Sequence, residues 1–230
     1  MNLISFQSVG QVSTAPAFKK GERAMTPDGR EWVYVKANTA LAAGSVAVPD
    51  AVTSVATVSS STDAQGRIVY INEASAGWTP GQFADGWVVV DTGTGAGQAG
   101  RIKDNSAEQI ELYPEFAFGT ALAVASSGIK IRTMGEVDKA AVTSKIQSAV
   151  GIAQVAFAAA DFGWLLTNGE GVVLAGEALT VGGSFVTGDD TTGQVVKGTT
   201  AKGEFDEQSL GICLVANGID EKHLVRVHIR

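Results

Sequence analysis

The sequence predicts an all-β protein built from small β-barrel or sandwich units, with an extended N-terminal arm and at most one or two short helices. Glycine is abundant, at 28 of 230 residues, and only 18% of the residues are charged. Short runs of β-branched and aromatic residues recur along the chain, and Gly, Pro, Asp, Asn or Thr separate them. Evenly spaced short strands with such turns are typical of barrels and sandwiches.

The pattern divides the chain into four parts. Residues 1–25 carry no charge before Lys19 and are expected to form an extended arm that lies on another surface. Residues 26–134 are expected to form a first β-rich part, and residues 150–230 a second, barrel-like part. Residues 135–149 between them are expected to be a linker or a short helix, because their apolar positions fit a helical stripe only loosely.

The first β-rich part opens at Thr26–Gly29, a strong turn signal in which Pro presets φ and Gly accepts a positive φ. The run that follows alternates, which places Trp32 and Tyr34 on one face and the intervening valines on the other. A polar loop is expected at Ser59–Gln65. The expected strands are Glu31–Ala37, Ser45–Val48, Val52–Val58, Arg67–Asn72, Trp87–Asp91, Arg101–Asp104, Gln109–Tyr113 and Ile129–Thr133.

The last third of the chain has a β pattern throughout. Its expected strands are Val150–Phe157, Gly163–Thr167, Gly171–Leu174, Ala178–Val181, Ser184–Thr187, Gln194–Lys197, Leu210–Ala216 and His223–Ile229. In the final strand Val225, Val227 and Ile229 share one face, which indicates a strand with one buried face. The segment Val150–Ala156 recurs as Leu210–Ala216, which fits two equivalent strands of one barrel better than a solenoid.

Charge and composition exclude several classes of protein. The chain has 17 Lys and Arg against 24 Asp and Glu, a net charge of −7, so bulk charge opposes binding to nucleic acid. A single cysteine rules out an intrachain disulfide framework and a zinc site built mainly on cysteine. The start of the chain lacks the pattern of a signal peptide, and no run of 18 apolar residues predicts a membrane span.

Each candidate for a chemical site has a simpler structural interpretation. Gly95-x-Gly97-x-x-Gly100 has the spacing of a dinucleotide fingerprint, but a short strand follows it rather than a helix, so a hairpin loop is expected. His223 and His228 fall on opposite faces of one strand and cannot chelate one metal ion from it.

The acidic pairs Asp189-Asp190 and Asp206-Glu207 are expected to be solvated turn residues, since no calcium-loop pattern surrounds them. Cys213 is expected to be a buried thiol. We therefore expect a protein that is not an enzyme and has no metal and no cofactor.

The larger aromatic residues have three interpretations. The first is that they form part of the core, the second that they form an inter-subunit contact, and the third that they form a platform on which a sugar stacks. Their scatter through predicted strands favours the core. These residues are Trp32, Tyr34, Trp78, Phe83, Trp87 and Trp164.

Three stretches of the chain carry motifs that recur in one family of proteins. The stretches are Asp28–Ala37 with Leu41–Gly44; Phe83–Asp91 with Gly93–Ile102; and Val150–Ala153 with Phe162–Gly169 and Leu210–Ile212. They resemble the decoration, or cement, proteins that accompany the major capsid protein on the heads of tailed bacteriophages. The third stretch departs from the family pattern at Phe162, where the family has Tyr, and at Leu166, where it has Gln.

The resemblance covers residues 26–230 and implies a structural virion protein on the outer surface of an icosahedral capsid. It implies the major capsid protein and further copies of this chain, as a homotrimer, as partners, with no role for nucleic acid or membrane. Low charge and an uncharged arm suit a chain that buries surface against such neighbours. The residues expected at the interface are Phe6, Val9, Val12, Phe18, Trp32, Tyr34 and Trp164.

Two other functions remain open from the sequence. One is a β-sandwich carbohydrate-binding or adhesion module of a head fibre or tail, which needs an exposed aromatic platform. The other is a hydrolase whose motifs are not recognisable in the sequence.

Overall fold

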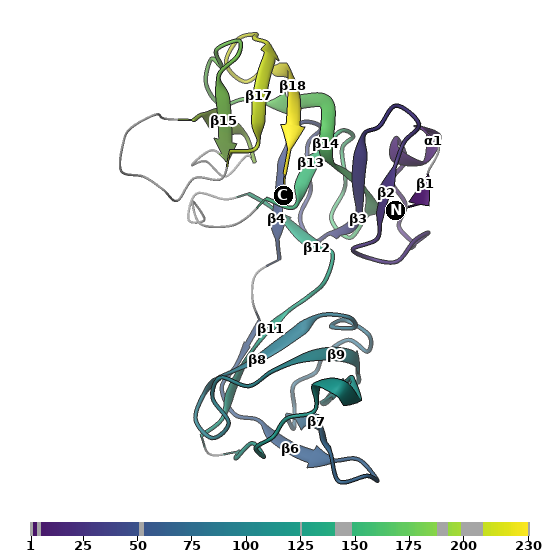
Figure 1. Cartoon of the computed structure of the whole chain (residues 1–230), viewed down its shortest axis with the longest axis vertical. Helices are drawn as coiled ribbons and strands as arrows, with labels where there is room; N and C mark the ends of the chain where they lie inside the picture. Colours follow the sequence, from purple (N-terminus) through teal and green to yellow (C-terminus); the bar gives the residue numbers. More distant parts are fainter. Residues whose placement is uncertain are drawn as a thin grey trace. The chain divides into compact units, whose positions relative to one another are not determined.

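The structure, a computed structural model, describes residues 2–3, 6–50, 53–124, 126–140, 149–187, 193–198 and 209–229. The prediction of an all-β fold is confirmed, because the regular elements among these residues are strands, apart from a four-residue helix and one 3₁₀ turn. The chain divides into two units (Figure 1), of which unit 1 comprises Met1–Asp50 and Gly135–Arg230, and unit 2 comprises Ala51–Met134.

Unit 1 is a sheet of 11 strands in the order β1-β2-β3-β12-β4-β13-β14-β18-β17-β15-β16. A further pairing between β3 and β14 closes five of these strands, β3, β12, β4, β13 and β14, into a small barrel. The elements are β1 (Asn2–Leu3), α1 (Phe6–Val9), β2 (Arg23–Met25), β3 (Glu31–Ala37), β4 (Val46–Pro49), β12 (Glu136–Lys139), β13 (Gly151–Ala153), β14 (Phe162–Leu174), β15 (Ser184–Thr187), β16 (Val195–Lys197), β17 (Gly211–Val215) and β18 (Lys222–His228).

Strand β14 joins the barrel to the rest of unit 1. Its first half pairs with β3 and its second half pairs with β18. One 13-residue strand therefore belongs both to the barrel and to the strands beyond it. Strand β3 is buried on both faces, with Val33 and Val35 in one apolar cluster and Trp32 and Tyr34 in another. Strand β18 alternates between buried and exposed residues, as predicted for a strand with one buried face.

The repeated segment identified in the sequence corresponds to β13 and β17. The order β13-β14-β18-β17 places these two strands at equivalent positions on either side of the β14–β18 pair. A side chain at either repeated glycine would collide with the neighbouring strand. An added Cβ would lie 2.7 Å from the Leu165 Cβ at Gly151 and 2.0 Å from the Arg226 carbonyl oxygen at Gly211. The repeat therefore reflects close packing at two matching places in one sheet.

Unit 2 is a sheet of seven strands in the order β5-β11-β8-β9-β10-β7-β6. The two end strands, β5 and β6, are separated by only three residues of chain, so the sheet must curl back on itself. Its interior is a separate apolar cluster that includes Phe83, Ile102 and Ile131. The elements are β5 (Thr53–Val55), β6 (Ser59–Thr62), β7 (Ile68–Asn72), β8 (Trp87–Thr92), β9 (Ala99–Asn105), β10 (Gln109–Leu112), η1 (Pro114–Phe116) and β11 (Gly128–Arg132).

The division of the chain differs from the one expected from the sequence. Residues 26–50 lie in unit 1 with the C-terminal residues, because β3 and β4 pair with β12, β13 and β14. These pairings join segments about 100 residues apart, and no local pattern records them. The expected linker or helix at 135–149 begins instead as strand β12, and residues 141–148 lie outside the described part of the chain.

Smaller expectations also differ from the structure. The polar loop expected from Ser59 contains β6, which pairs with β7. The strands expected at 163–167 and 171–174 are one continuous strand, β14, and the segment expected as a strand at 178–181 is not one. The arm is not simply extended, since it contains α1 and ends in β2.

Candidate interaction sites

The N-terminal arm lies on unit 1 through a few specific contacts. Ser13 and Phe162 exchange two backbone hydrogen bonds of 3.0 and 2.7 Å, and the Ala17 N–H donates to the Tyr34 hydroxyl over 3.0 Å. Residues 10–17, which include both anchors, are all exposed and carry no charge. The arm therefore offers an exposed uncharged segment whose position is fixed by the sheet beneath it.

Four aromatic rings lie under this segment. The Phe18 ring meets Tyr34 and Trp164 edge-on at centroid distances of 5.3 and 5.1 Å, and Phe162 stacks on Tyr34 at 6.4 Å. Together with Ser8, Gln11, Val12, Ser13 and Ala17, these rings line a pocket of about 230 Å³. The pocket has no charged lining residue, and the buried Trp164 Nε1–H has no hydrogen-bond partner among the described residues.

Most of the residues expected at an interface lie in the core of unit 1. Val9, Trp32, Tyr34 and Trp164 belong to one buried cluster, and Phe18 packs against it half-buried. Burial of both faces of β3 explains this, because alternation alone shows which residues share a face but not what covers that face.

Of the remaining expected interface residues, Val12 is 38% exposed. Phe6 falls in α1, but its side chain lies outside what the structure describes.

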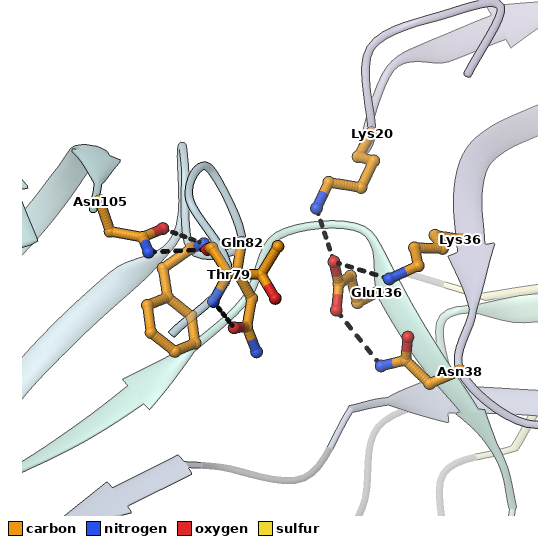
Figure 2. Close-up of polar contacts among 8 residues, drawn as sticks. Lys20, Lys36, Asn38, Thr79, Gln82, Asn105 and Glu136 are labelled. Carbon is orange, nitrogen blue, oxygen red and sulfur yellow. Dashed lines mark hydrogen bonds and ion pairs between the residues drawn. The ribbon is translucent and has the colours of Figure 1, made fainter. Parts of the chain in front are cut away.

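A buried carboxylate ties the end of the arm to strand β12. Glu136 Oε1 accepts from Lys20 Nζ at 2.7 Å and lies 3.7 Å from Lys36 Nζ, while Asn38 Nδ2 donates to Oε2 at 3.3 Å (Figure 2). Glu136 is only 5% exposed, so its charge needs these partners. The Glu136 carbonyl also accepts a hydrogen bond from the Asp50 N–H. The chain leaves unit 1 after Asp50 and returns to it at Gly135, so this bond joins the two ends of unit 1 where the chain leaves and returns.

Replacing Glu136 by glutamine is expected to lower the free energy of unfolding of unit 1 by about 2 kcal/mol, because charge-assisted hydrogen bonds weaken and Lys20 loses its partner. Chemical denaturation would measure the loss. Glu170→Gln is the matched control, since the side chains of Glu170 and Arg226, which form an ion pair, are both more than half exposed. Equal losses for the two variants would contradict the argument.

The corresponding buried polar group in unit 2 is Asn105. Its side-chain oxygen accepts from the Phe83 N–H at 2.7 Å, and its Nδ2 donates to the Thr79 carbonyl at 2.9 Å (Figure 2). Gln82 Oε1 accepts from the Thr79 N–H at 3.2 Å. The asparagine therefore satisfies the backbone of an irregular loop and has a structural role.

The outer face of unit 2 carries the one candidate aromatic residue that is exposed. Of the six aromatic residues considered from the sequence, Trp78 and Phe83 are buried in unit 2, whereas Trp87 is 39% exposed. Its ring meets Phe116 edge-on at a centroid distance of 5.3 Å. The sequence missed this difference because Trp87 begins a strand whose buried face is set by Val88 and Val90.

The remaining candidates have structural roles where the structure describes them. Gly95 and Gly97 lie in the turn of the β8–β9 hairpin, and Gly100 lies in strand β9, where it pairs with Val88. His223 is buried, accepting from the Asn217 N–H at 3.1 Å through Nδ1 and bonding the Gly218 carbonyl at 3.0 Å through Nε2.

His228 is exposed on the opposite face of the same strand from His223. Among the described residues no group of three or more His, Cys, Asp or Glu could hold a metal ion. The acidic pairs Asp189-Asp190 and Asp206-Glu207 lie outside the described residues.

Cys213 is buried in the core of unit 1, and desolvation raises the pKa of its thiol. Both effects suppress the thiolate that reacts with disulfide reagents. We expect labelling by Ellman's reagent at pH 8 to be on the order of 100-fold slower in the folded protein than in denaturant. The chain has one cysteine, so the absorbance reports this site alone, and fast stoichiometric labelling of the folded protein would show that β17 opens.

Comparisons with known proteins give one structural similarity. No protein-family model and no curated protein matches the chain. Among solved structures, the N base of head fibre gp8.5 of bacteriophage phi29 aligns with 85% of this chain and 92% of its own, at 10% identity and a TM-score of 0.36. A TM-score this low does not establish a common fold. In the described part of the chain, no helix is long and apolar enough to cross a membrane.

Proposed function

We propose that this chain is a non-enzymatic structural protein of a tailed-phage virion, which binds the outer surface of the head and stabilises it by bridging major capsid subunits. The proposal extends the resemblance of its sequence motifs to decoration proteins. In unit 1 the first and third of these motifs lie side by side, since Trp32–Lys36 of β3 pairs with Phe162–Leu166 of β14, and Gly151–Ala153 forms β13 beside it.

The observation that carries the proposal is the arm. Residues 10–17 form an exposed, uncharged segment that few bonds fix to the sheet. Such a segment gives a partner an apolar surface and free backbone groups without the cost of removing charges from water. Because a capsid repeats its sites many times, a modest contact for each copy gives a large total avidity.

Substitution tests the arm better than deletion. Removing residues 2–20 would take Phe18 and the Lys20–Glu136 bond away from the core, so loss of binding would not separate contact from folding. Val12→Asp places a charge in the exposed segment, and Val181→Asp, at a residue 62% exposed elsewhere in unit 1, is the control.

We expect Val12→Asp to reduce co-sedimentation with undecorated capsids at least about tenfold, as burial of an unpaired charge would do. The Val181→Asp variant is expected to bind as the unchanged chain does. Equal binding by the unchanged chain and both variants would contradict the role of the arm. Light scattering of the free protein tests the proposed homotrimer separately.

A second candidate is a carbohydrate-binding or adhesion module of a head fibre or tail. The observation that favours it is the exposure of Trp87 on the outer face of the sheet of unit 2, which supplies the aromatic platform that such a module requires. A glycan array would give a saturable signal if this function is correct.

A further inference from the structure

The outer face of unit 2 carries a row of alternating cationic and aromatic side chains. Trp87 of β8 lies directly opposite Arg132 of β11 on one side and Arg101 of β9 on the other. Tyr113 continues the row, since its N–H donates to the Arg101 carbonyl. Directly opposed residues of a sheet share a face, so the row crosses three strand spacings, roughly 14 Å.

The aromatic members of this row are held in place. Phe116 contacts the Trp87 ring edge-on, and the Arg101 guanidinium lies over the Tyr113 ring at 5.4 Å. Asp85 Oδ1 accepts from the Tyr113 hydroxyl at 3.1 Å and from Arg101 Nη2 at 3.3 Å. A ring that is fixed and partly exposed binds a flat apolar surface with little loss of conformational entropy.

The two arginines of the row differ in whether an acidic side chain pairs with them. Arg101 is paired with Asp85, whereas Arg132 is exposed and has no ion pair or hydrogen bond from its side chain among the described residues. Strand pairing places Arg132 directly opposite Trp87, so the two side chains extend from the same face of the sheet. A guanidinium binds a carboxylate through two parallel hydrogen bonds, which an ammonium group cannot do.

We propose that this row, Arg132–Trp87–Arg101–Tyr113, binds an oligosaccharide that carries a carboxylate. One pyranose ring stacks on Trp87, its carboxylate pairs with Arg132, and neighbouring hydroxyl groups bond to Asp85 and Arg101. The proposal rests on the second candidate function and names its site and ligand class.

A nucleic acid fits this row less well than an acidic sugar. Stacked bases would bring a line of phosphates across a face that also carries Asp85, Asp91 and Glu111, on a chain of net charge −7. A sugar acid brings one carboxylate for each ring and stacks through its C–H groups. Arg132, the one arginine of the row with no ion pair among the described residues, matches one such carboxylate.

The test uses the full chain with two sets of probes, oligogalacturonates of two to six residues and neutral galacto-oligosaccharides of the same lengths. The backbone amide signals in NMR spectra report binding in every variant, and the Trp87 indole N–H signal reports it in the unchanged chain. We expect the acidic set to bind at least tenfold more tightly than the neutral set. Trp87→Ala should abolish both, and Arg132→Gln should remove the preference while keeping weak binding to both.

Three results would each overturn part of the argument. Equal affinity of the unchanged chain for both sets would overturn the carboxylate assignment and leave glycan binding intact. Acid-selective binding that survives Trp87→Ala would place the site elsewhere. Absence of binding to either set, together with a silent glycan array, would overturn both the inference and the function on which it rests.

Two controls complete the experiment. Lys103→Gln changes a cation on the same sheet that is paired with Glu111, and it should leave binding unchanged. A thymidine oligonucleotide that bound more tightly than the oligogalacturonates would overturn the choice of ligand. Near-ultraviolet circular dichroism checks that the variants retain the packed core around Trp78 and Phe83.

Discussion

Trp164→Ala is expected to destabilise unit 1 by about 4 kcal/mol, close to the cost of removing a large ring from a rigid core. The side chain is 1% exposed and contacts Phe18 and Tyr34, so the cavity would open where the arm meets the sheet. Unit 2 has its own core and should keep its stability. Denaturation followed in the two units separately, by hydrogen exchange, would measure the difference.

Two conservative variants make this prediction sharper. Trp164→Phe should cost less than Trp32→Phe, because the Trp164 Nε1–H has no partner among the described residues, while the Trp32 Nε1–H donates to Thr26 Oγ1 at 3.2 Å. The exposed Trp87→Ala should stay within about 1 kcal/mol of the unchanged chain. If Trp164→Ala cost no more than Trp87→Ala, the arm would not be packed as described.

Gly211→Ala is expected to destabilise unit 1 by about 3 kcal/mol or more. The residue has φ of +154°, which side chains avoid, and an added Cβ would lie 2.0 Å from the Arg226 carbonyl oxygen. Relief of that contact would require β17 to separate from β18, which it pairs with. The free energy of unfolding of unit 1 in urea would measure the effect.

Gly182 provides the control for this prediction. It also has a positive φ, +78°, but nothing lies within 4 Å of an added Cβ. Gly182→Ala should therefore cost only the backbone term, about 1–2 kcal/mol. A similar loss at both glycines would show that the contact with β18 relaxes easily and that the repeated glycine is not required by packing.

The comparison of Trp87 with Trp32 shows that a sequence pattern does not predict whether a strand face is covered or exposed. The sequence assigns Trp32 to one face of an alternating strand, but it gives no face to Trp87 and groups both residues with the core. In β3 a second cluster covers the other face too, so Trp32 is buried, whereas the outer face of β8 is solvated and Trp87 is exposed. What covers a face depends on segments far away in the chain, and no local window contains them.

Local chemistry was enough to determine most of the strands and the all-β class, because turn residues and a two-residue period act over a few positions. The same information identified the repeated strands β13 and β17 and the one-sided burial of β18.

Only the tertiary structure decided which segments pair. It placed residues 26–50 in unit 1, closed the barrel through β3 and β14, and brought Arg132 beside Trp87. These contacts join residues 45 to more than 100 positions apart, and their energy comes from burial that exists only once the whole sheet has formed.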